Sequence, residues 1–322
     1  MRGPGSSISV AVDARKVLTP RDAERIFSGL ARSYRAIASN IPILVVAPWL
    51  SSRTREILNS DGINYLDLTG NAWISIDHPS NIFISSQGDD RNRAPSPRGK
   101  ARVRGPKAGR LIRFLLDVKP PYSVSHIAAA TGLAPGYVSR LLDTLDNEAL
   151  IDRVRRGEVV SVDVAGLVYR WAEDYDILGS NKARSFVASQ GPRSLLEQLT
   201  TISASVQLAV TGSFAAVRLA PIAAPTLLAL YCSDIAGIAE RTKLIPSERG
   251  ANVVLLGPFD PVVWARTTTE GGITYAAVSQ VVVDCLTGNG RMPAEGEAVL
   301  AWMQSNESSW RISSIGELQI AS

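Results

Sequence analysis

One segment near the middle of the chain, Ser123–Ile151, constrains the fold more than any other part of the sequence. Ser123 or Ser125 is placed to cap a first helix, and Gly132 supplies the residue with positive φ that ends it. Pro135 suits the first turn of a second helix, because the N–H that proline lacks would have no partner there. The buried stripe of this second helix is expected to contain Val138, Leu141, Leu142 and Leu145. The pattern predicts a helix-turn-helix.

A β-hairpin is predicted directly after the two helices. Residues 152–163 alternate like two strands joined at Arg156-Gly157-Glu158, and the hairpin signal runs from Ile151 to Val164. The tip of this hairpin is basic. A helix-turn-helix followed by such a hairpin is a winged helix-turn-helix, expected here over residues 107–175. In this kind of domain the second helix enters the major groove of double-stranded DNA.

The exposed start of the second helix is the part that would contact bases. Arg140 is the strongest single candidate, because an arginine can bind a guanine through two hydrogen bonds. Tyr137 and Ser139 could equally bind phosphate oxygens. Basic side chains of the wing and of the segment before the first helix would add affinity by releasing counterions. The candidate DNA-binding residues are Arg102, Arg104, Lys107, Ser123, Pro135, Gly136, Tyr137, Ser139, Arg140, Arg153, Arg155 and Arg156.

A basic stretch rich in proline and glycine, residues 91–106, precedes this domain. The net charge of the chain is only +4, but no acidic residue interrupts the run of arginines and lysines from Arg91 to Arg110. The stretch predicts a flexible basic linker. Winged helices also serve as protein-interaction modules, so the fold by itself does not establish DNA binding. The basic linker, the basic wing tip and Arg140 favour DNA over a protein partner.

The regions on either side of the predicted winged helix alternate helix and strand signals. In residues 1–90, helices are expected at 20–38 and 52–59, and strands at 41–47, 63–68, 73–76 and 82–84. In residues 176–322, helices are expected at 195–202, 213–219, 235–243, 279–286 and 294–303, and strands at 206–210, 227–231, 252–256, 262–265 and 273–276. A further helix is expected over 168–175. The fold class is therefore multi-domain α/β, with an α/β domain on each side of the winged helix.

Length and composition narrow the classes of function. A chain of 322 residues fits two or three domains, and its longest apolar stretches are too short to span a bilayer. Its start lacks the pattern of a secretory signal, so a cytoplasmic protein without a membrane partner is expected. Cys232 and Cys285 lie in apolar runs, which favours buried reduced thiols. With only His78 and His126, the sequence offers no zinc set or Ser-His-Asp triad, and no cofactor is predicted.

Two segments of the first ninety residues resemble a known domain. Ile43–Pro48 (ILVVAP) and Tyr65–Ile74 (YLDLTGNAWI) resemble the N-terminal domain of bacterial antitoxin regulators of the AbiEi family, which is similar to the restriction-endonuclease core. Nuclease chemistry needs carboxylates for a divalent metal and usually a lysine. Residues 41–90 contain no lysine, and the carboxylates considered there are Glu56, Asp61, Asp67 and Asp77. The sequence therefore predicts a degenerate nuclease-like domain, with Gly70-Asn71 as a tight turn and Trp73 in the core.

The C-terminal half also contains a motif that resembles an enzyme site. Val210–Ala216 (VTGSFAA) is similar to the Gly-Ser turn of nucleotidyltransferases, where a helix N-terminus can hold phosphate. The two carboxylates that should follow on the next strand are missing between Ala224 and Tyr231, so Gly212-Ser213 is expected to be a helix-capping turn. The elements that resemble the C-terminal domain of AbiEi-type proteins are Thr211–Ala216, Gly250–Val253, Gln280–Asp284 and Gly290-Arg291.

The resemblance to the AbiEi family implies a regulator of a type IV toxin-antitoxin system. Such a protein would repress its own operon by binding an operator, would lack catalytic activity, and would have a nucleotidyltransferase-like toxin as a partner. Two alternatives remain open. The first is a metal-dependent nuclease that a winged helix guides to DNA. The second is a ligand-responsive regulator, with Gly212-Ser213 and Arg218 as an anion site in the C-terminal domain.

Overall fold

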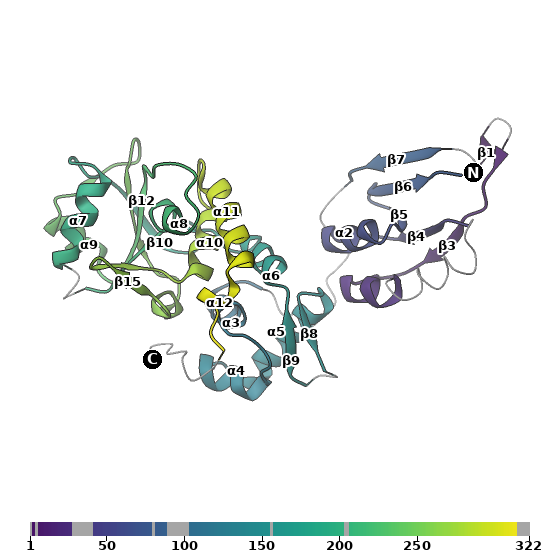
Figure 1. Cartoon of the computed structure of the whole chain (residues 1–322), viewed down its shortest axis with the longest axis horizontal. Helices are drawn as coiled ribbons and strands as arrows, with labels where there is room; N and C mark the ends of the chain where they lie inside the picture. The colour runs from purple at the N-terminus through teal and green to yellow at the C-terminus, as the bar shows by residue number, and fades with distance from the viewer. Residues whose placement is uncertain are drawn as a thin grey trace. The chain divides into compact units, whose positions relative to one another are not determined.

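A computed structural model describes residues 2–3, 6–27, 41–78, 81–88, 103–154, 157–202 and 206–313 of the chain (Figure 1). The chain is a mixed α/β protein, as its sequence predicts. It divides into two compact units. The first consists of Met1–Lys100 with Leu142–Ile151, and the second of Ala101–Leu141 with Asp152–Ser322. Most of the predicted linker, residues 91–102, lies outside the described residues.

The first unit is built on a five-stranded sheet in the order β3-β4-β5-β6-β7. Its strands are β3 (Ala11–Ala14), β4 (Ile43–Ala47), β5 (Asn64–Asp67), β6 (Ala72–Ile76) and β7 (Ile82–Ser86). The first three strands are parallel, and the last two continue the sheet antiparallel. Helix α2 (Ser52–Ser60) connects β4 to β5, and a small hairpin, β1 (Arg2–Gly3) with β2 (Ser6–Ser7), lies at the start of the chain.

The core of the first unit lies between one face of this sheet and two helical segments. Residues 20–27 are helical, and the remainder of the helix predicted over 20–38 lies outside the described residues. Phe27 of this segment and Leu58 of α2 are buried with Val45 of β4. Trp73 packs against the same cluster, which confirms its predicted place in the core. Alternating apolar residues on the strands thus give the sheet one face that needs helices to cover it.

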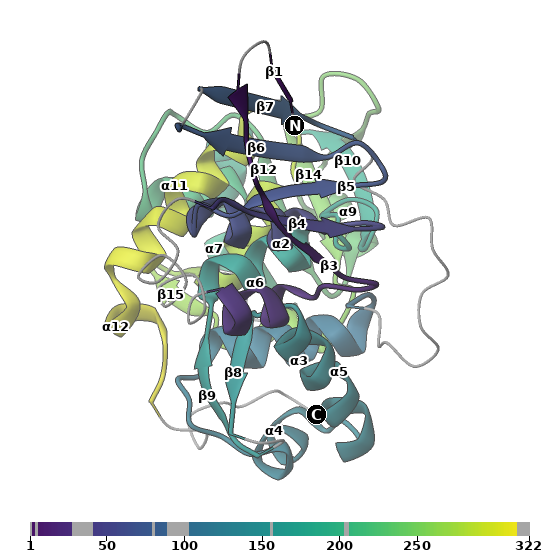
Figure 2. The ribbon, with the colours of Figure 1, turned by 90° about the vertical axis from the view of Figure 1, so that its right-hand side faces the viewer.

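The second unit begins with three helices, a hairpin and a fourth helix. They are α3 (Pro106–Asp117), α4 (Val124–Thr131), α5 (Pro135–Asn147), β8 (Ile151–Arg153), β9 (Val159–Val162) and α6 (Val164–Ala172). The last part of α5 belongs to residues that group with the first unit. Helix α3 contacts both α4 and α6. Figures 1 and 2 show α4 and the hairpin β8–β9 at the same end of this unit.

The rest of the second unit is a seven-stranded mixed sheet with helices on both faces. The strand order is β13-β10-β14-β12-β11-β16-β15. The strands are β10 (Lys182–Val187), β11 (Leu208–Thr211), β12 (Leu228–Cys232), β13 (Ile245–Pro246), β14 (Val253–Gly257), β15 (Thr268–Glu270) and β16 (Ile273–Tyr275). The helices are α7 (Pro192–Ile202), α8 (Ser213–Leu219), α9 (Ile235–Arg241), α10 (Val278–Leu286), α11 (Met292–Ser305) and α12 (Glu307–Trp310). Figure 1 shows α7 and α9 on one side of the sheet and α10 and α11 on the other.

One prediction for this sheet region was wrong, and β10, β13 and β15 were not predicted. Most of residues 262–265, expected as a strand, belong to a 3-10 helix, η1 (Pro261–Trp264). The Asp260 carboxylate accepts a hydrogen bond from the N–H of Val262 (2.9 Å), and Pro261 occupies the first turn, so this segment carries a helix-start signal. Strand β10 was not predicted, because its alternating residues include two exposed cations, Lys182 and Arg184, in place of an apolar stripe.

The two cysteines are buried, as predicted. Cys232 lies in β12 and Cys285 in α10, and both thiols are free. Burial raises the pKa of the Cys232 thiol to about 12, with a smaller contribution from Asp234. Neither thiol is therefore ionised near neutral pH, and both behave as small apolar side chains.

Candidate nucleic-acid interface

Helix α4 is fixed at both ends by the residues that the sequence predicts for this purpose. The hydroxyl of Ser123 accepts a hydrogen bond from the backbone N–H of His126 (3.2 Å). At the other end Gly132 adopts a φ of 67°, and its N–H donates to the carbonyl of Ala128 (2.9 Å). Glycine adopts this left-handed conformation without steric cost. The direction in which the chain leaves α4 is therefore set by local chemistry.

Helix α5 begins at Pro135, also as predicted. The carbonyl of Ala134 accepts the first hydrogen bonds of the helix, from the N–H groups of Tyr137 (2.9 Å) and Val138 (3.1 Å). The side chains of Val138 and Leu141 are fully buried, which fixes the rotation of the helix about its axis. The opposite side of the first turns of α5 is left to face solvent.

The predicted contact residues of α5 differ in exposure. Pro135, Gly136 and Arg140 are exposed, whereas Tyr137 and Ser139 are half-buried. The Arg140 Nη1 atom lies 3.7 Å from the place where a Cβ atom on Gly136 would stand, so the guanidinium lies along the first turn of the helix. An exposed arginine beside a residue without a side chain leaves room for a close approach by a large ligand.

The hydroxyl of Tyr137 is suited to donate a hydrogen bond. Burial raises the pKa of Tyr137 above its ordinary value, and the positive charge of Arg140 opposes part of this rise. The phenol is therefore protonated near neutral pH and can donate to an anionic oxygen. Tyr137 and Arg140 together offer donors on one turn of α5.

The hairpin that follows α5 is short, and Tyr122 forms an isolated bridge to its second strand. The N–H and carbonyl of Tyr122 pair with those of Val159 in β9 (3.2 and 3.0 Å). Arg153 of β8 is half-buried, and its Nε atom donates a long hydrogen bond to the carbonyl of Gly157 (3.5 Å). Arg155 and Arg156, which the sequence places at the wing tip, lie outside the described residues.

A second group of cations lies at the start of α3. Arg104 and Lys107 are exposed, and no acidic residue occupies the first turn of the helix. The N-terminal end of a helix is the positive end of its dipole, so cations there do not stabilise the helix itself. The cations and the helix end together favour a bound anion such as phosphate. Arg102, the third cation predicted here, lies outside the described residues.

Two cations of α3, Arg110 at the end of the basic run and Arg113 just after it, are engaged inside the fold. Arg110 forms a bidentate ion pair with Asp260 (3.1 and 2.7 Å) and donates to the carbonyl of Thr131 (3.1 Å). The side chain of Arg113 is fully buried. Neither is available to a nucleic acid. Sequence reasoning could not identify the pair of Arg110 with Asp260 or the bond of Arg113 to the carbonyl of Val262, because these partners lie about 150 residues further along the chain. The ion pair of Arg113 with Asp117, one helical turn away, could have been predicted from its spacing.

Sequence reasoning left out two exposed residues that lie close to the candidate contacts. Ser125 and His126 occupy the first turn of α4 and are exposed. The first helix of a helix-turn-helix crosses the DNA backbone, so its first turn is a position for phosphate contacts. Because Ser123 is recognisable in the sequence as the N-cap of this helix, it locates the first turn, and both residues could have been predicted as contacts from it.

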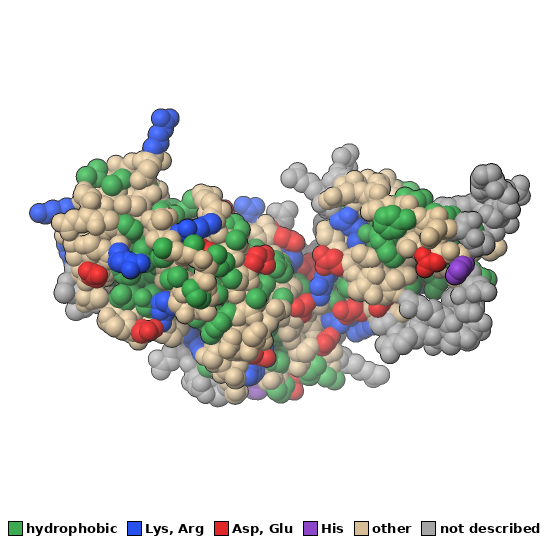
Figure 3. Space-filling view, turned by 45° about the horizontal axis from the view of Figure 1, so that its top comes forward, with side chains coloured by type: hydrophobic (Ala, Val, Ile, Leu, Met, Phe, Trp, Pro, Cys, Tyr) green, Lys and Arg blue, Asp and Glu red, His purple; other side chains and the backbone are tan. Residues whose placement is uncertain are grey.

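Surface charge alone does not mark the interface. On the face shown in Figure 3, lysine and arginine side chains are scattered among acidic and apolar ones. Around the candidate contacts, Asp143, Asp152 and Glu158 are also exposed. The candidate interface is therefore distinguished by the position of its residues on α3, α5 and the hairpin, and not by charge of one sign.

The carboxylate of Asp67, the central residue of the nuclease alternative, is occupied by donors from its own loop and from Leu50, which lies between β4 and α2. It accepts hydrogen bonds from the N–H of Leu50 (3.1 Å), from the N–H and hydroxyl of Thr69 (2.9 and 2.7 Å), and from the N–H and side chain of Asn71 (3.0 and 2.9 Å). Burial alone would raise the pKa of Asp67, but these hydrogen bonds lower it. In the described part of the chain, no group of three His, Cys, Asp or Glu residues could hold a metal ion. Asp67 therefore organises the turn at Gly70-Asn71.

The groups considered for an anion site in the C-terminal half are also engaged. Gly212 has a φ of 62° and precedes α8, as expected for a capping turn. The buried hydroxyl of Ser213 donates to the carboxylate of Glu295 (2.5 Å). The guanidinium of Arg218 lies 3.7 Å from the ring centre of Tyr275 and pairs with Glu270. Because the carboxylate of Glu295 lies against Ser213, it disfavours the binding of an anion at this turn.

Comparisons of the chain with protein-family models, with curated proteins and with solved structures gave no match. No helix within the described ranges is both long and apolar enough to cross a membrane.

Proposed function

We propose that this protein is a sequence-specific regulator of transcription that binds double-stranded DNA through a winged helix-turn-helix. The order of α3, α4, α5 and the hairpin β8–β9 supports this assignment. The observation that carries it is the exposed start of α5, where Arg140 lies beside Gly136 while Val138 and Leu141 anchor the helix. Arg140 reads a base in the major groove, and Arg104, Lys107 and Arg153 hold phosphates.

A finer role rests on the sequence resemblance to the AbiEi family alone. In that role the protein is a cytoplasmic antitoxin that represses its own operon and has a nucleotidyltransferase-like toxin as its partner. The first unit is then a degenerate nuclease-like domain without catalytic activity. The occupied carboxylate of Asp67 supports this reading of the first unit.

Binding of fluorescent duplexes from the chain's own upstream region tests the proposed function. Wild type should bind one duplex more tightly than a scrambled duplex, with an affinity that falls as salt rises. Arg140→Ala should weaken binding to the preferred duplex by about 1–3 kcal/mol, the cost of losing a bidentate base contact. Arg249→Ala is the matched control, because Arg249 is exposed on the second unit far from α5 in sequence.

The outcomes separate the candidate functions. Equal affinity for every duplex, or an Arg140→Ala variant that behaves like Arg249→Ala, would refute base reading by α5. Cleavage of the duplex on addition of magnesium would favour the nuclease instead, and an increase in thermal stability with added nucleotides would favour a ligand-responsive regulator.

A further inference from the structure

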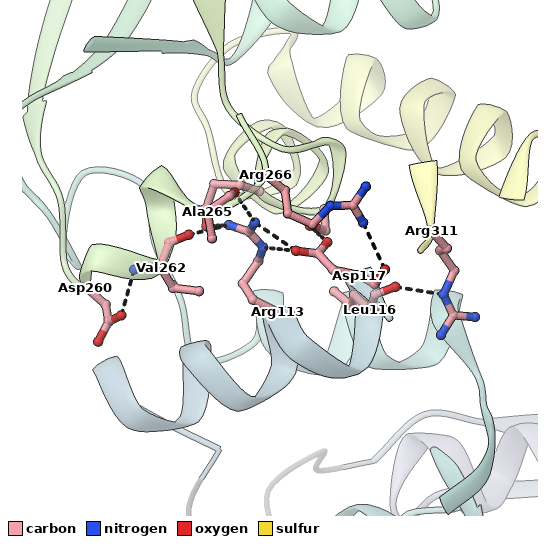
Figure 4. Close-up of polar contacts among 10 residues, drawn as sticks. Arg113, Leu116, Asp117, Asp260, Val262, Ala265, Arg266 and Arg311 are labelled. Carbon is pink, nitrogen blue, oxygen red and sulfur yellow. Dashed lines mark hydrogen bonds and ion pairs between the residues drawn. The ribbon is translucent and has the colours of Figure 1, made fainter. Parts of the chain in front are cut away.

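The carbonyl groups at the end of α3 are satisfied from the far end of the chain. The last carbonyls of a helix have no partners within it. The buried guanidinium of Arg311 donates to the carbonyls of Leu115 (3.0 Å), Leu116 (2.8 Å) and Val118 (2.8 Å). Arg266 donates to the carbonyl of Asp117 (3.0 Å). Figure 4 shows these arginines around the last turn of α3.

The backbone after Arg311 also pairs with the chain that leaves α3. The N–H of Ile312 donates to the carbonyl of Asp117 (2.9 Å), and the N–H of Lys119 donates to the carbonyl of Ile312 (2.8 Å). Val118 and Ile312 form a parallel bridge. The connecting segment from Val118 leads to Tyr122, which forms an isolated bridge to Val159 of the hairpin. The C-terminal segment thus holds the chain immediately before α4.

Charge strengthens this junction. A cation at the C-terminal end of a helix interacts favourably with the helix dipole. Arg311 is itself paired with Glu307 of α12 (2.6 Å). Nearby, the buried Asp117 carboxylate accepts hydrogen bonds from Arg113 (3.0 Å) and Ser279. Arg266 has a φ of 57°, a conformation that costs a non-glycine residue energy and that its surroundings must hold in place.

We propose that Arg311 is a positioning residue for DNA recognition, an inference that rests on the function proposed above. Arg311 is 7% exposed, so it does not contact DNA itself. It fixes the end of α3 and the connecting segment before α4, and through them the spacing of α5 and the hairpin. Base contacts require this spacing, whereas attraction to phosphates requires only exposed charge. The C-terminal segment therefore determines specificity more than overall affinity.

The test compares operator and scrambled duplexes with the full-length chain. Arg311→Met keeps the length of the side chain but removes its charge and donors. It should weaken operator binding by about tenfold or more, while scrambled-duplex binding changes by less than about twofold. Arg311→Lys keeps the charge but lacks the several donors of the guanidinium, so its operator affinity should lie between those of wild type and Arg311→Met. Arg249→Met, an exposed substitution, should leave both affinities unchanged.

A second variant keeps the test decisive if Arg311→Met does not fold. Glu307→Gln removes the charge partner of Arg311 from a half-exposed position and leaves the guanidinium in place. It should lower the ratio of operator to scrambled affinity by about twofold to fivefold with little change in melting temperature. An unchanged ratio in both folded variants would overturn the inference alone. Wild type that prefers no duplex would overturn the proposed function together with it.

Discussion

At the scale of single residues, two buried aspartates show how the surroundings of a carboxyl group set its pKa. Asp67 accepts five hydrogen bonds, four of them from its own tight loop and one from Leu50, and its pKa is lowered despite burial. Asp284 of α10 is fully buried, and burial raises its pKa to about 6, although hydrogen bonds from Thr211, Tyr175 and others oppose the rise. For Asp284 the effect of burial outweighs that of the hydrogen bonds, whereas for Asp67 the hydrogen bonds, those of the Thr69 and Asn71 side chains first, outweigh burial.

The raised pKa of Asp284 predicts a pH-dependent stability. The folded chain binds an extra proton between the ordinary aspartate pKa of about 3.9 and the folded value of about 6, so this contribution to stability falls as pH rises through that window. The Asp284→Asn variant has no carboxyl group at this position and therefore takes up no such proton. Relative to this variant, wild type should lose up to about 3 kcal/mol of unfolding free energy between about pH 4 and pH 6.

Urea unfolding of both proteins across this pH range measures the difference directly. Glu248→Gln, which alters an exposed carboxylate, serves as the control and should track wild type. A difference between wild type and Asp284→Asn that stays constant over the window would contradict a raised pKa for the buried carboxyl.

At the scale of elements, local signals were sufficient wherever the partner of a residue lies within a few positions. Ser123, Gly132 and Pro135 act within one turn: α4 begins and ends, and α5 begins, where these residues predict. Local signals failed for β10, which is recognisable only through its neighbours β13 and β14. The ion pair of Arg110 with Asp260 could not be predicted for the same reason. The start of η1 was predictable from Asp260-Pro261, and the apolar residues after it were misinterpreted.

Substitutions of two glycines, Gly132 at the end of α4 and Gly136 in the first turn of α5, should have opposite effects on stability. Gly132→Ala should destabilise the chain by about 1–2 kcal/mol, because alanine at a φ of 67° is strained. Gly136 lies inside α5 with room for a methyl group, since the nearest atom would be 3.7 Å from the new Cβ. Gly136→Ala should therefore stabilise it by up to about 1 kcal/mol. Thermal unfolding of both variants checks the signs. Equal signs would show that the turn does not depend on the left-handed conformation.

At the scale of the whole molecule, the second unit joins the candidate DNA-binding segment to the large sheet through α10. This helix contacts α3 and α6 as well as α8, α11 and β11. Gln280 of α10 accepts a hydrogen bond from Arg113 of α3 (3.2 Å) and donates one to Asp284 (2.9 Å). A continuous buried polar network thus runs from α3 to the strands, and the unit should unfold as one.

Hydrogen exchange tests this coupling. Val282→Ala removes buried methyl groups from α10 and should lower the free energy of exchange of α10 amides on the order of 2 kcal/mol. The amides of α3 should lose protection by a similar amount, because the two helices open together. Val160→Ala, on the exposed side of β9, should change neither. Loss of protection in α10 with the amides of α3 unaffected would show that the two helices open independently.

The central claim is that the start of α5 lies on specific DNA, and affinity cleavage tests it most directly. Gly136→Cys places an exposed thiol there, whereas Cys232 and Cys285 are buried and escape labelling. An iron chelate attached at position 136 should cleave one short stretch inside the preferred upstream duplex, and the same chelate on Ser189→Cys should not. A bound duplex that is cut from both positions alike, or from neither, would contradict the claim.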